Sequence, residues 1–294
     1  MARVRRWLIC APVSLVLYGA SYDGDAAAQD SNGVYAIFNP TPDNRLREFG
    51  TDRPDLTEGP FTINAGRLQL ESDLFNYTRS RPDQDGTLTE KFLFGATTVR
   101  IGVTSNTEIG FVLQPYNAMR TRMTEAPGRT WNAGPDVLQI RPKINFWGND
   151  TFQNPGATAF GVVPFFNIPT VRNGVGSEHV EGGVAFPFAY KVSGNVDIGV
   201  MTQFEYIRNE SGVGYHVEYV NSGLVSYQHN SQWTTYFEVY SRFGNESPHG
   251  GIVLVGVGLL YKLADNMQLD FGVNFGVTRA ADSFNPFIGL SRRF

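Results

Sequence analysis

The stretch VLQIRPKINF, residues 137–146, alternates between apolar and polar side chains. Residues two apart lie on the same face of a β-strand. One face therefore holds Leu138, Ile140, Pro142, Ile144 and Phe146, and the other holds Gln139, Arg141, Lys143 and Asn145. The stretch also exceeds the roughly five or six residues that are usual for strands of soluble proteins. It predicts a long strand whose apolar face meets either a protein core or lipid.

The same period of two recurs from residue 66 to the end of the chain. We expect strands at 66–78, 90–104, 107–116, 136–147, 157–168, 179–192, 195–208, 214–228, 232–243, 251–263, 266–278 and 284–294. A strand tilted through a bilayer needs about 9–11 residues in the hydrocarbon. The pattern predicts an all-β fold: an antiparallel up-and-down transmembrane β-barrel of the bacterial outer membrane with about twelve strands. A soluble β-sandwich is the alternative, but its outward faces would be polar.

Turn lengths and aromatic positions predict how the barrel is oriented. TSNT (104–107) and ADNM (264–267) are tight turns, whereas the stretches near 117–134 and 243–250 are longer and polar. Outer-membrane barrels have short periplasmic turns and longer extracellular loops. Aromatic residues then form two interfacial rows, at Phe146, Trp147, Tyr190, Tyr227, Trp233, Tyr261 and Phe294 below and at Tyr116, Phe166, Tyr206 and Tyr215 above. We expect the terminal Phe294 to be needed for assembly.

The N-terminus has the pattern of an export signal. A basic start, MARVRR, precedes the apolar run WLICAPVSLVLYGA (7–20) and an Ala-x-Ala site that predicts cleavage after Ala28. A buried N-terminal helix is the alternative. Cys10 lies in this segment, so the predicted mature chain has no cysteine and no disulfide. The net charge of −4 argues against nucleic-acid binding.

Five prolines fall inside the expected strands, at Pro115, Pro142, Pro164, Pro187 and Pro286. Proline cannot donate to the hydrogen-bonded ladder, and a closed barrel has no edge strand to hold it. We therefore expect a bulge or a strand end at each proline.

Residues 29–65 lack the alternation. The stretch TDRPDLTEGPFTINAGRLQLE (51–71), with Thr51, Asp52, Arg53, Pro54 and Asp55 at its start, resembles the opening of the family named for the meta-pathway of phenol degradation. Gly59 stands where that family more often has Ser. The resemblance implies an outer-membrane barrel of the transporter-like kind. The export signal, the stretch without alternation and the strand pattern divide the chain into a signal peptide (1–28), a periplasmic or lumen-plugging segment (29–65) and a barrel (66–294).

The predicted inner wall is polar and nearly neutral. Its charged positions are Arg67, Glu71, Asp73, Arg100, Glu108, Arg141, Lys143, Glu181, Lys191, Asp197, Glu205, Glu218, Glu238, Arg242, Lys262, Asp270 and Arg293. Arg or Lys facing lipid at the bilayer midplane would cost about 2–4 kcal/mol each. The candidate transport residues are the cations Arg141 and Lys143 and a second group, Glu205, Glu218, Glu238 and Arg242. The HNSQ turn (229–232) places Glu218 roughly opposite Arg242.

Two other kinds of chemistry have weaker support. His216 and Ser222 are the nearest candidate pair for a membrane-embedded hydrolase, but no nucleophile elbow accompanies them. His179 with Glu181 and His216 with Glu218 are weak metal candidates, because a spacing of two keeps each pair on one face. We expect no enzyme activity, no cofactor and no bound metal.

These observations predict a passive channel for small solutes, with aromatic or other small organic compounds suggested by the family resemblance. Its expected partners are outer-membrane lipid, the barrel assembly machinery and a small-molecule solute, without nucleic acid. A structural barrel filled by its own side chains is the first alternative and a hydrolase is the second.

Overall fold

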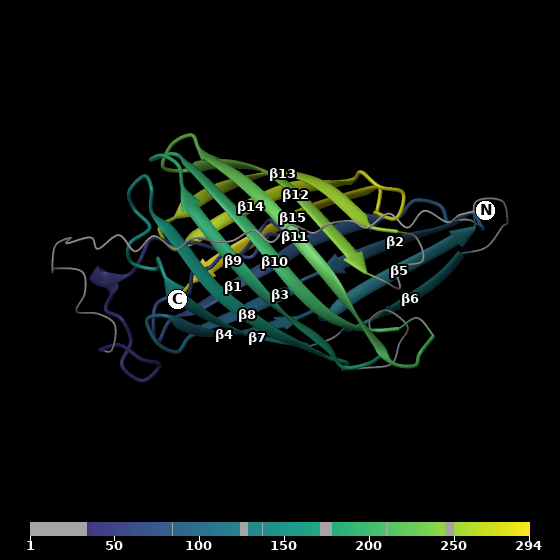
Figure 1. Cartoon of the computed structure of the whole chain (residues 1–294), viewed down its shortest axis with the longest axis horizontal. Helices are drawn as coiled ribbons and strands as arrows, with labels where there is room; N and C mark the ends of the chain where they lie inside the picture. Colours follow the sequence, from purple (N-terminus) through teal and green to yellow (C-terminus); the bar gives the residue numbers. More distant parts are fainter. Residues whose placement is uncertain are drawn as a thin grey trace, which may run out of the picture.

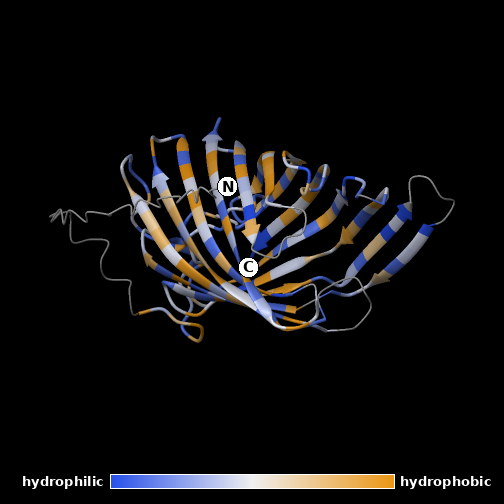
Figure 2. Cartoon of the chain, turned by 45° about the vertical axis from the view of Figure 1, so that its right-hand side comes forward, coloured by the Kyte–Doolittle hydropathy of each residue, from blue (hydrophilic) through white to orange (hydrophobic). Residues whose placement is uncertain are grey.

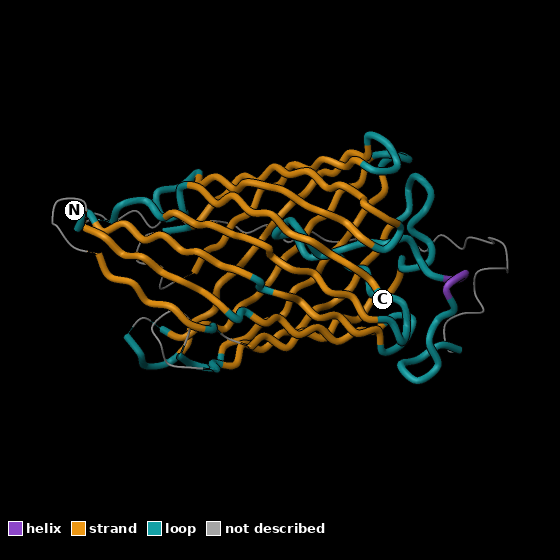
Figure 3. The backbone as a smooth tube through the Cα atoms, turned by 180° about the vertical axis from the view of Figure 1, so that it is seen from behind, coloured by secondary structure: helices purple, strands orange, loops and turns teal. Residues whose placement is uncertain are grey.

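The architecture comes from a computed structural model that describes residues 34–83, 85–123, 129–136, 138–170, 178–209, 211–244 and 250–294. The predicted signal peptide lies outside these residues. Fifteen strands form one antiparallel sheet, and β15 pairs with β1 to close it into a barrel (Figures 1 and 3). The strands are β1 (Leu68–Arg79), β2 (Thr87–Phe94), β3 (Thr97–Gly102), β4 (Thr107–Leu113), β5 (Tyr116–Met123), β6 (Arg129–Gly134), β7 (Leu138–Trp147), β8 (Thr158–Ile168), β9 (Glu181–Lys191), β10 (Val196–Arg208), β11 (Tyr215–Gln228), β12 (Trp233–Gly244), β13 (Ile252–Ala264), β14 (Met267–Gly276) and β15 (Phe284–Arg293).

The fifteen strands make twelve crossings of the wall, because three crossings are each interrupted once and so consist of two strands. The interrupted strands are β2 with β3, β4 with β5, and β6 with β7, and each half pairs with the corresponding half of its neighbour. The predicted twelve-stranded antiparallel barrel is therefore confirmed. No helix among the described residues is long and apolar enough to span a membrane.

The interruptions shift the alternation of inward and outward side chains by one residue. In the strands β2 and β5, on one side of the interruptions, the even-numbered Phe94 and Tyr116 are exposed on the outer face. In the strands β3 and β4, on the other side, the even-numbered Arg100 and Glu108 are buried and pair with each other in the lumen. A single alternating register therefore cannot run through residues 87–102 or 107–123.

The structure of residues 117–134 differs from the expectation from the sequence. They were expected to form an extracellular loop, but β5 and β6 form a hairpin there, around residues 124–128 that are not described. The sequence YNAMRTRM is polar on both strand faces, so it lacks the hydrophobic alternation of a lipid-facing strand. The hairpin extends to the barrel end opposite the C-terminus (Figure 1).

The outer face is apolar and the inner face polar. Figure 2 shows hydrophobic and hydrophilic residues alternating along the strands. Both predicted aromatic rows face outward: Phe146 and Tyr227 are exposed in one, and Tyr116 and Phe166 are exposed in the other. An apolar belt between aromatic rows is the surface that a bilayer requires.

The prolines behave differently from the prediction. Only Pro115 lies at a strand end; Pro142, Pro164, Pro187 and Pro286 lie inside strands, and the register shifts lie elsewhere. Along the β7–β8 ladder, paired residues jump from Ile140 to Ile144 without a change of register. The barrel thus accommodates the missing donors by omitting local rungs. The expectation of a bulge or a strand end therefore holds for Pro115 and was wrong for the other four prolines.

The C-terminus closes the barrel next to the N-terminal segment. The Phe294 backbone N–H donates to the Leu68 carbonyl at 2.8 Å, and the Phe294 ring lies under the Arg292 guanidinium. The short helix Asp43–Arg45 and the tight turns lie at this same end (Figure 1).

We predict that this end faces the periplasm. Single cysteines can replace Val213, in the turn between β10 and β11, and Asp265, in the tight turn between β13 and β14; both side chains are exposed. A membrane-impermeant maleimide should label intact cells at 213 and not at 265. Both sites should react after the outer membrane is permeabilised. Labelling of intact cells at 265 alone would reverse the orientation.

Candidate functional site

A segment that precedes the first strand crosses the inside of the barrel. Residues 47–64 make polar contacts with side chains of β1, β3, β4, β7, β11, β12 and β14. These strands surround most of the lumen in the sheet order. We call residues 47–64 the lumen segment.

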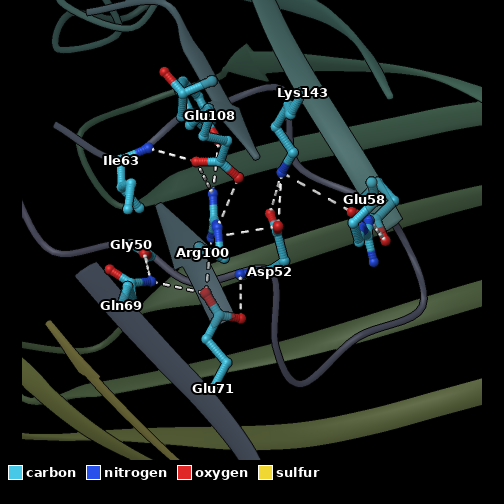
Figure 4. A network of polar contacts seen from close by, with 12 residues as sticks. Gly50, Asp52, Glu58, Ile63, Gln69, Glu71, Arg100, Glu108 and Lys143 are labelled. Carbon is cyan, nitrogen blue, oxygen red and sulfur yellow. Dashed lines mark hydrogen bonds and ion pairs between the residues drawn. The ribbon is translucent and has the colours of Figure 1, made fainter. Parts of the chain in front are cut away.

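Arg100 on β3 is the centre of the largest ionic network (Figure 4). Its guanidinium is 3% exposed and pairs with Glu71 on β1 at 2.7 Å and with Glu108 on β4 at 2.8 Å. It also lies 3.3 Å from Asp52 and donates to the Phe61 carbonyl at 3.0 Å. One buried cation thus joins two wall carboxylates to the lumen segment at two points.

Lys143 on β7 fixes the same part of the segment from another side of the wall. Its ammonium is 1% exposed and donates to both Asp52 carboxylate oxygens, at 2.6 and 2.7 Å. Burial alone would raise the pKa of Asp52, but Arg100 and Lys143 outweigh it and lower that pKa to about 2. Asp52 is therefore a carboxylate at neutral pH.

Arg53 contacts the wall at the barrel closure, on the two strands that flank β15. Its guanidinium pairs with Asp73 on β1 at 3.0 Å and with Asp270 on β14 at 2.9 Å. A Cβ atom on Gly289 would collide with this guanidinium. A side chain at position 289 would therefore displace the Arg53 guanidinium, which compensates two wall carboxylates at once.

The segment reaches a third part of the wall at β11 and β12. The Leu56 backbone N–H and the Thr57 hydroxyl both donate to the Glu238 carboxylate. The Thr57 hydroxyl also lies 2.8 Å from the Ser222 hydroxyl. Glu238 is 1% exposed, so these contacts satisfy a carboxylate that is removed from solvent.

The predicted transport residues form two groups. Arg141 pairs with Glu58 and Lys143 with Asp52, so each of these cations faces a carboxylate of the lumen segment. Glu238 belongs to the same contact region. Arg242, Glu205 and Glu218 form a separate cluster, in which Arg242 lies 2.9 Å from Glu205 and also pairs with Glu218.

The cross-strand register of the second cluster differs from the expectation by two residues. Arg242 lies directly opposite Val220, and Glu218 lies opposite Gly244. The ion pair between Arg242 and Glu218 is therefore diagonal. Long side chains span such diagonal neighbours.

The TDRPD motif is the part of the lumen segment with most of the ionic contacts. Asp52 and Arg53 make the pairs described above, and the Thr51 hydroxyl donates to the Arg53 carbonyl at 2.6 Å. The bond from Arg53 to Pro54 is cis. Burial, followed by the charge of Glu238, raises the pKa of Asp55 well above its ordinary value. The motif thus carries one compensated carboxylate and one that resists ionisation.

The structure separates the candidate catalytic pair. His216 and Ser222 lie six residues apart on β11, which is roughly 20 Å along a strand. His216 contacts Asn209 and Glu218, and Ser222 contacts Thr57. These two residues therefore cannot act as a Ser–His pair in this conformation.

The metal candidates likewise do not form one site. His216 Nε2 lies 3.3 Å from Glu218 Oε1, while Glu181 accepts a hydrogen bond from the Arg208 backbone. Within the described residues, no group of three or more His, Cys, Asp or Glu side chains is arranged to hold a metal ion.

Two features of the lumen were not identified from the sequence as site features. The first is the anchoring role of Arg100, Glu108 and Asp270, which were expected on the inner wall but not as contacts of the N-terminal segment. The second is an apolar cluster made by Val163, Ala185, Met201 and Val220. The alternation places each of these residues on the inward face of its own strand, but only the closed sheet shows that they meet.

Comparisons with known proteins agree with this architecture. The family described as "Putative MetA-pathway of phenol degradation" matches residues 51–294. The chain belongs to this family. A search of curated proteins finds no significant match.

Among solved structures, the COG4313 outer membrane channel from Pseudomonas putida F1 is similar with a TM-score of 0.64. The sequences are 10% identical, and the match covers 83% of this chain and all (100%) of the channel. The NanC porin matches with a TM-score of 0.49 and 11% identity, over 76% of this chain and 98% of the porin. The chain thus has the fold of a bacterial outer-membrane β-barrel.

We predict that Arg53 is a principal anchor of the lumen segment. Arg53→Leu leaves Asp73 and Asp270 without their cation, and loss of one partner of a buried pair typically costs about 3–5 kcal/mol. Hydrogen–deuterium exchange of residues 50–58 should become faster, while exchange in β9 and β10 stays unchanged.

Arg45→Leu is the matched control. Arg45 lies in the short helix Asp43–Arg45 and its guanidinium bonds only with the exposed Tyr35 hydroxyl among the described residues. It should leave exchange in residues 50–58 unaltered. Equal exchange in the Arg53 variant and the unchanged protein would show that Arg53 does not anchor the segment.

Proposed function

We propose that this protein is a gated passive channel for small solutes, and that the lumen segment is its gate. The observation that carries the proposal is the polar character of the closure. Ion pairs and hydrogen bonds connect the segment to β1, β3, β7, β12 and β14. Water and solute ions can replace such contacts when the segment withdraws.

The apolar contribution of the segment is small. Leu56 is exposed, Phe49 and Phe61 are partly buried, and the buried apolar side chains of the described lumen segment are Pro54, Pro60 and Ile63. A segment with little apolar burial gains little from the hydrophobic effect in the lumen. Its position depends instead on compensated charges, whose net contribution to stability is small compared with their desolvation cost.

The wall that would be exposed is suited to anions. Withdrawal removes Asp52 and Glu58 from Lys143 and Arg141, which lie two residues apart on one face of β7. Two adjacent cations in a low-dielectric channel concentrate a positive potential. We infer that small organic anions, including ionised aromatic compounds, pass this site.

A filled barrel without transport is the second candidate. The apolar cluster on β8–β11 favours it, because Val163 and Val220 are almost completely buried with the segment in place. In that case the segment would be a permanent core, and its removal would not produce a conducting barrel.

Conductance distinguishes these candidates. We expect the full-length protein in a planar bilayer to conduct rarely, and a variant that lacks residues 29–60 to conduct continuously. In the truncated background, Arg141→Glu with Lys143→Glu should shift the reversal potential under a salt gradient from anion preference toward cation preference.

Arg208→Glu in the same truncated background is the control. Arg208 lies over the Tyr215 ring on the outer side of the barrel, so reversal of its charge should not change selectivity. A folded truncated barrel that never conducts would refute the channel and favour the filled barrel. Conduction with unchanged selectivity would refute the role of Arg141 and Lys143 alone.

The gate should also respond to pH. The lowered pKa of Asp52 stabilises the segment in its position inside the lumen, which we call the docked state. This contribution is complete at pH values above the ordinary pKa of 3.8 and is lost as pH falls toward about 2. Asp55 has a raised pKa, so its protonated form favours docking, and this contribution is lost as pH rises from 3.8 through the raised value. Docking is therefore strongest near the ordinary Asp value.

We predict that the open probability of the full-length channel rises as pH increases above the ordinary Asp value of 3.8, by roughly tenfold for each unit of pKa elevation that Asp55 experiences. Asp55→Asn should reduce this rise and leave unit conductance unchanged. A steep rise that persists in Asp55→Asn would assign the pH response to other groups.

A further inference from the structure

The outer face of the β1–β2–β5–β6 region has a cationic cluster that the channel does not use. Arg79 on β1, Arg120 and Arg122 on β5 and Arg129 on β6 lie on neighbouring paired positions. The single acid among them in the described structure is Glu90 on β2, which lies opposite both Arg79 and Arg120. We call these five residues the outer arginine cluster.

The cluster points away from the lumen. Side chains alternate between the two faces of these strands. The face opposite the arginines carries Asn76, Lys91 and Asn117, which line an inner cavity of about 280 Å³. The outer face carries Phe94 and Tyr116 in the aromatic row below the cluster. The arginines therefore lie on the membrane-facing side of the wall, beyond its apolar belt.

Glu90 compensates only part of this charge. Its carboxylate lies 2.5 Å from Arg120, 3.9 Å from Arg122 and accepts a hydrogen bond from the Tyr77 hydroxyl at 2.7 Å. Within the described residues, Arg79 and Arg129 have no carboxylate partner, and both are exposed. Four guanidinium groups and one carboxylate give the described cluster a net charge of +3.

The strand register makes this excess of positive charge unfavourable unless an anion is bound. Arg122 and Arg129 lie directly opposite each other across β5 and β6. Like charges at directly opposed positions of an antiparallel pair destabilise the sheet. A phosphate group between them would compensate both guanidinium groups with charge-assisted hydrogen bonds.

Aromatic side chains lie beside the charges. Trp131 on β6 is 54% exposed and stacks on Phe92, with ring centroids 5.8 Å apart. The Arg120 guanidinium lies over both rings, at 5.8 and 5.4 Å from their centroids. This surface therefore combines fixed cations with apolar rings that can contact acyl chains or sugar rings.

We propose that the outer arginine cluster binds the phosphorylated head group of an outer-leaflet glycolipid of the lipid A class. The position of the cluster next to the aromatic row places guanidinium groups at head-group depth, where basic surfaces attract anionic lipid groups. Trp131 and Phe92 contact the lipid beside its phosphates. Binding compensates the opposed arginines and holds the β5–β6 hairpin in the leaflet.

Full-length protein in detergent tests this proposal by native mass spectrometry with two probes. These are diphosphoryl lipid A and the same lipid after removal of both phosphates. We expect the diphosphoryl form to bind at least about tenfold more tightly, which corresponds to roughly one charge-assisted contact. Equal binding of the two lipids would overturn the proposal.

Arg122→Gln with Arg129→Gln should lower the affinity for diphosphoryl lipid A by roughly tenfold or more. Lys91→Gln is the matched control, because Lys91 follows Glu90 on β2 but faces the inner cavity; it should bind like the unchanged protein. All variants should retain the heat-modifiable band of a folded barrel. If the double variant misfolds, Arg79→Gln provides the same comparison at the edge of the cluster.

Inorganic phosphate separates a lipid site from a general anion site. Millimolar phosphate should not displace diphosphoryl lipid A, because the lipid also contacts the aromatic rings. Displacement at that concentration, or undiminished lipid binding by both arginine variants, would contradict the proposed lipid site.

Discussion

The ladder between β15 and β1 is the contact on which the rest of the structure depends. In hydrocarbon, every backbone donor and acceptor must be satisfied within the protein, so a sheet can span a membrane only as a closed barrel. Pairing of Gln69 with Arg293 and of Asp73 with Gly289 supplies that closure. It also separates an inside from an outside, which determines where every alternating side chain lies.

Closure has a direct consequence for the charges. A ring of inward residues brings Glu71, Arg100, Glu108 and Asp270 into a confined space, where each carboxylate or guanidinium needs a partner. The wall alone supplies some pairs, such as Arg100 with Glu108. The lumen segment supplies others, because Arg53 bridges Asp73 and Asp270 and Asp52 bridges Arg100 and Lys143. The segment and the wall are therefore electrostatically complementary, although they are distant in sequence.

The three interrupted strands give the barrel two different halves. Toward the C-terminal end, the lumen is polar and occupied, and the outer face is apolar. Beyond the interruptions, the alternation is displaced by one residue, and the strands carry charge on both faces: Lys91 inside and Arg120 outside. This displacement lets the same wall combine a lipid-facing belt with a charged outer surface in the head-group region.

The sequence by itself determined the strand pattern, the number of crossings, the apolar belt and its aromatic rows. These depend on local alternation, which a period of two reveals residue by residue. The alternation of Gln139, Arg141, Lys143 and Asn145 also identified an inward face, since charges there avoid lipid.

Tertiary structure alone decided which charges meet. Arg53 contacts Asp270, which lies 217 positions away in the sequence, and no local pattern indicates that pair. The hairpin of β5 and β6 was invisible for a different reason: outside the hydrocarbon, neither strand face needs to be apolar, so residues 117–134 read as a loop. Likewise, Pro142 and Pro164 were compatible with strand interiors because neighbouring rungs of the closed sheet compensate for their missing donors. Long-range pairing, and not residue type, decided these features.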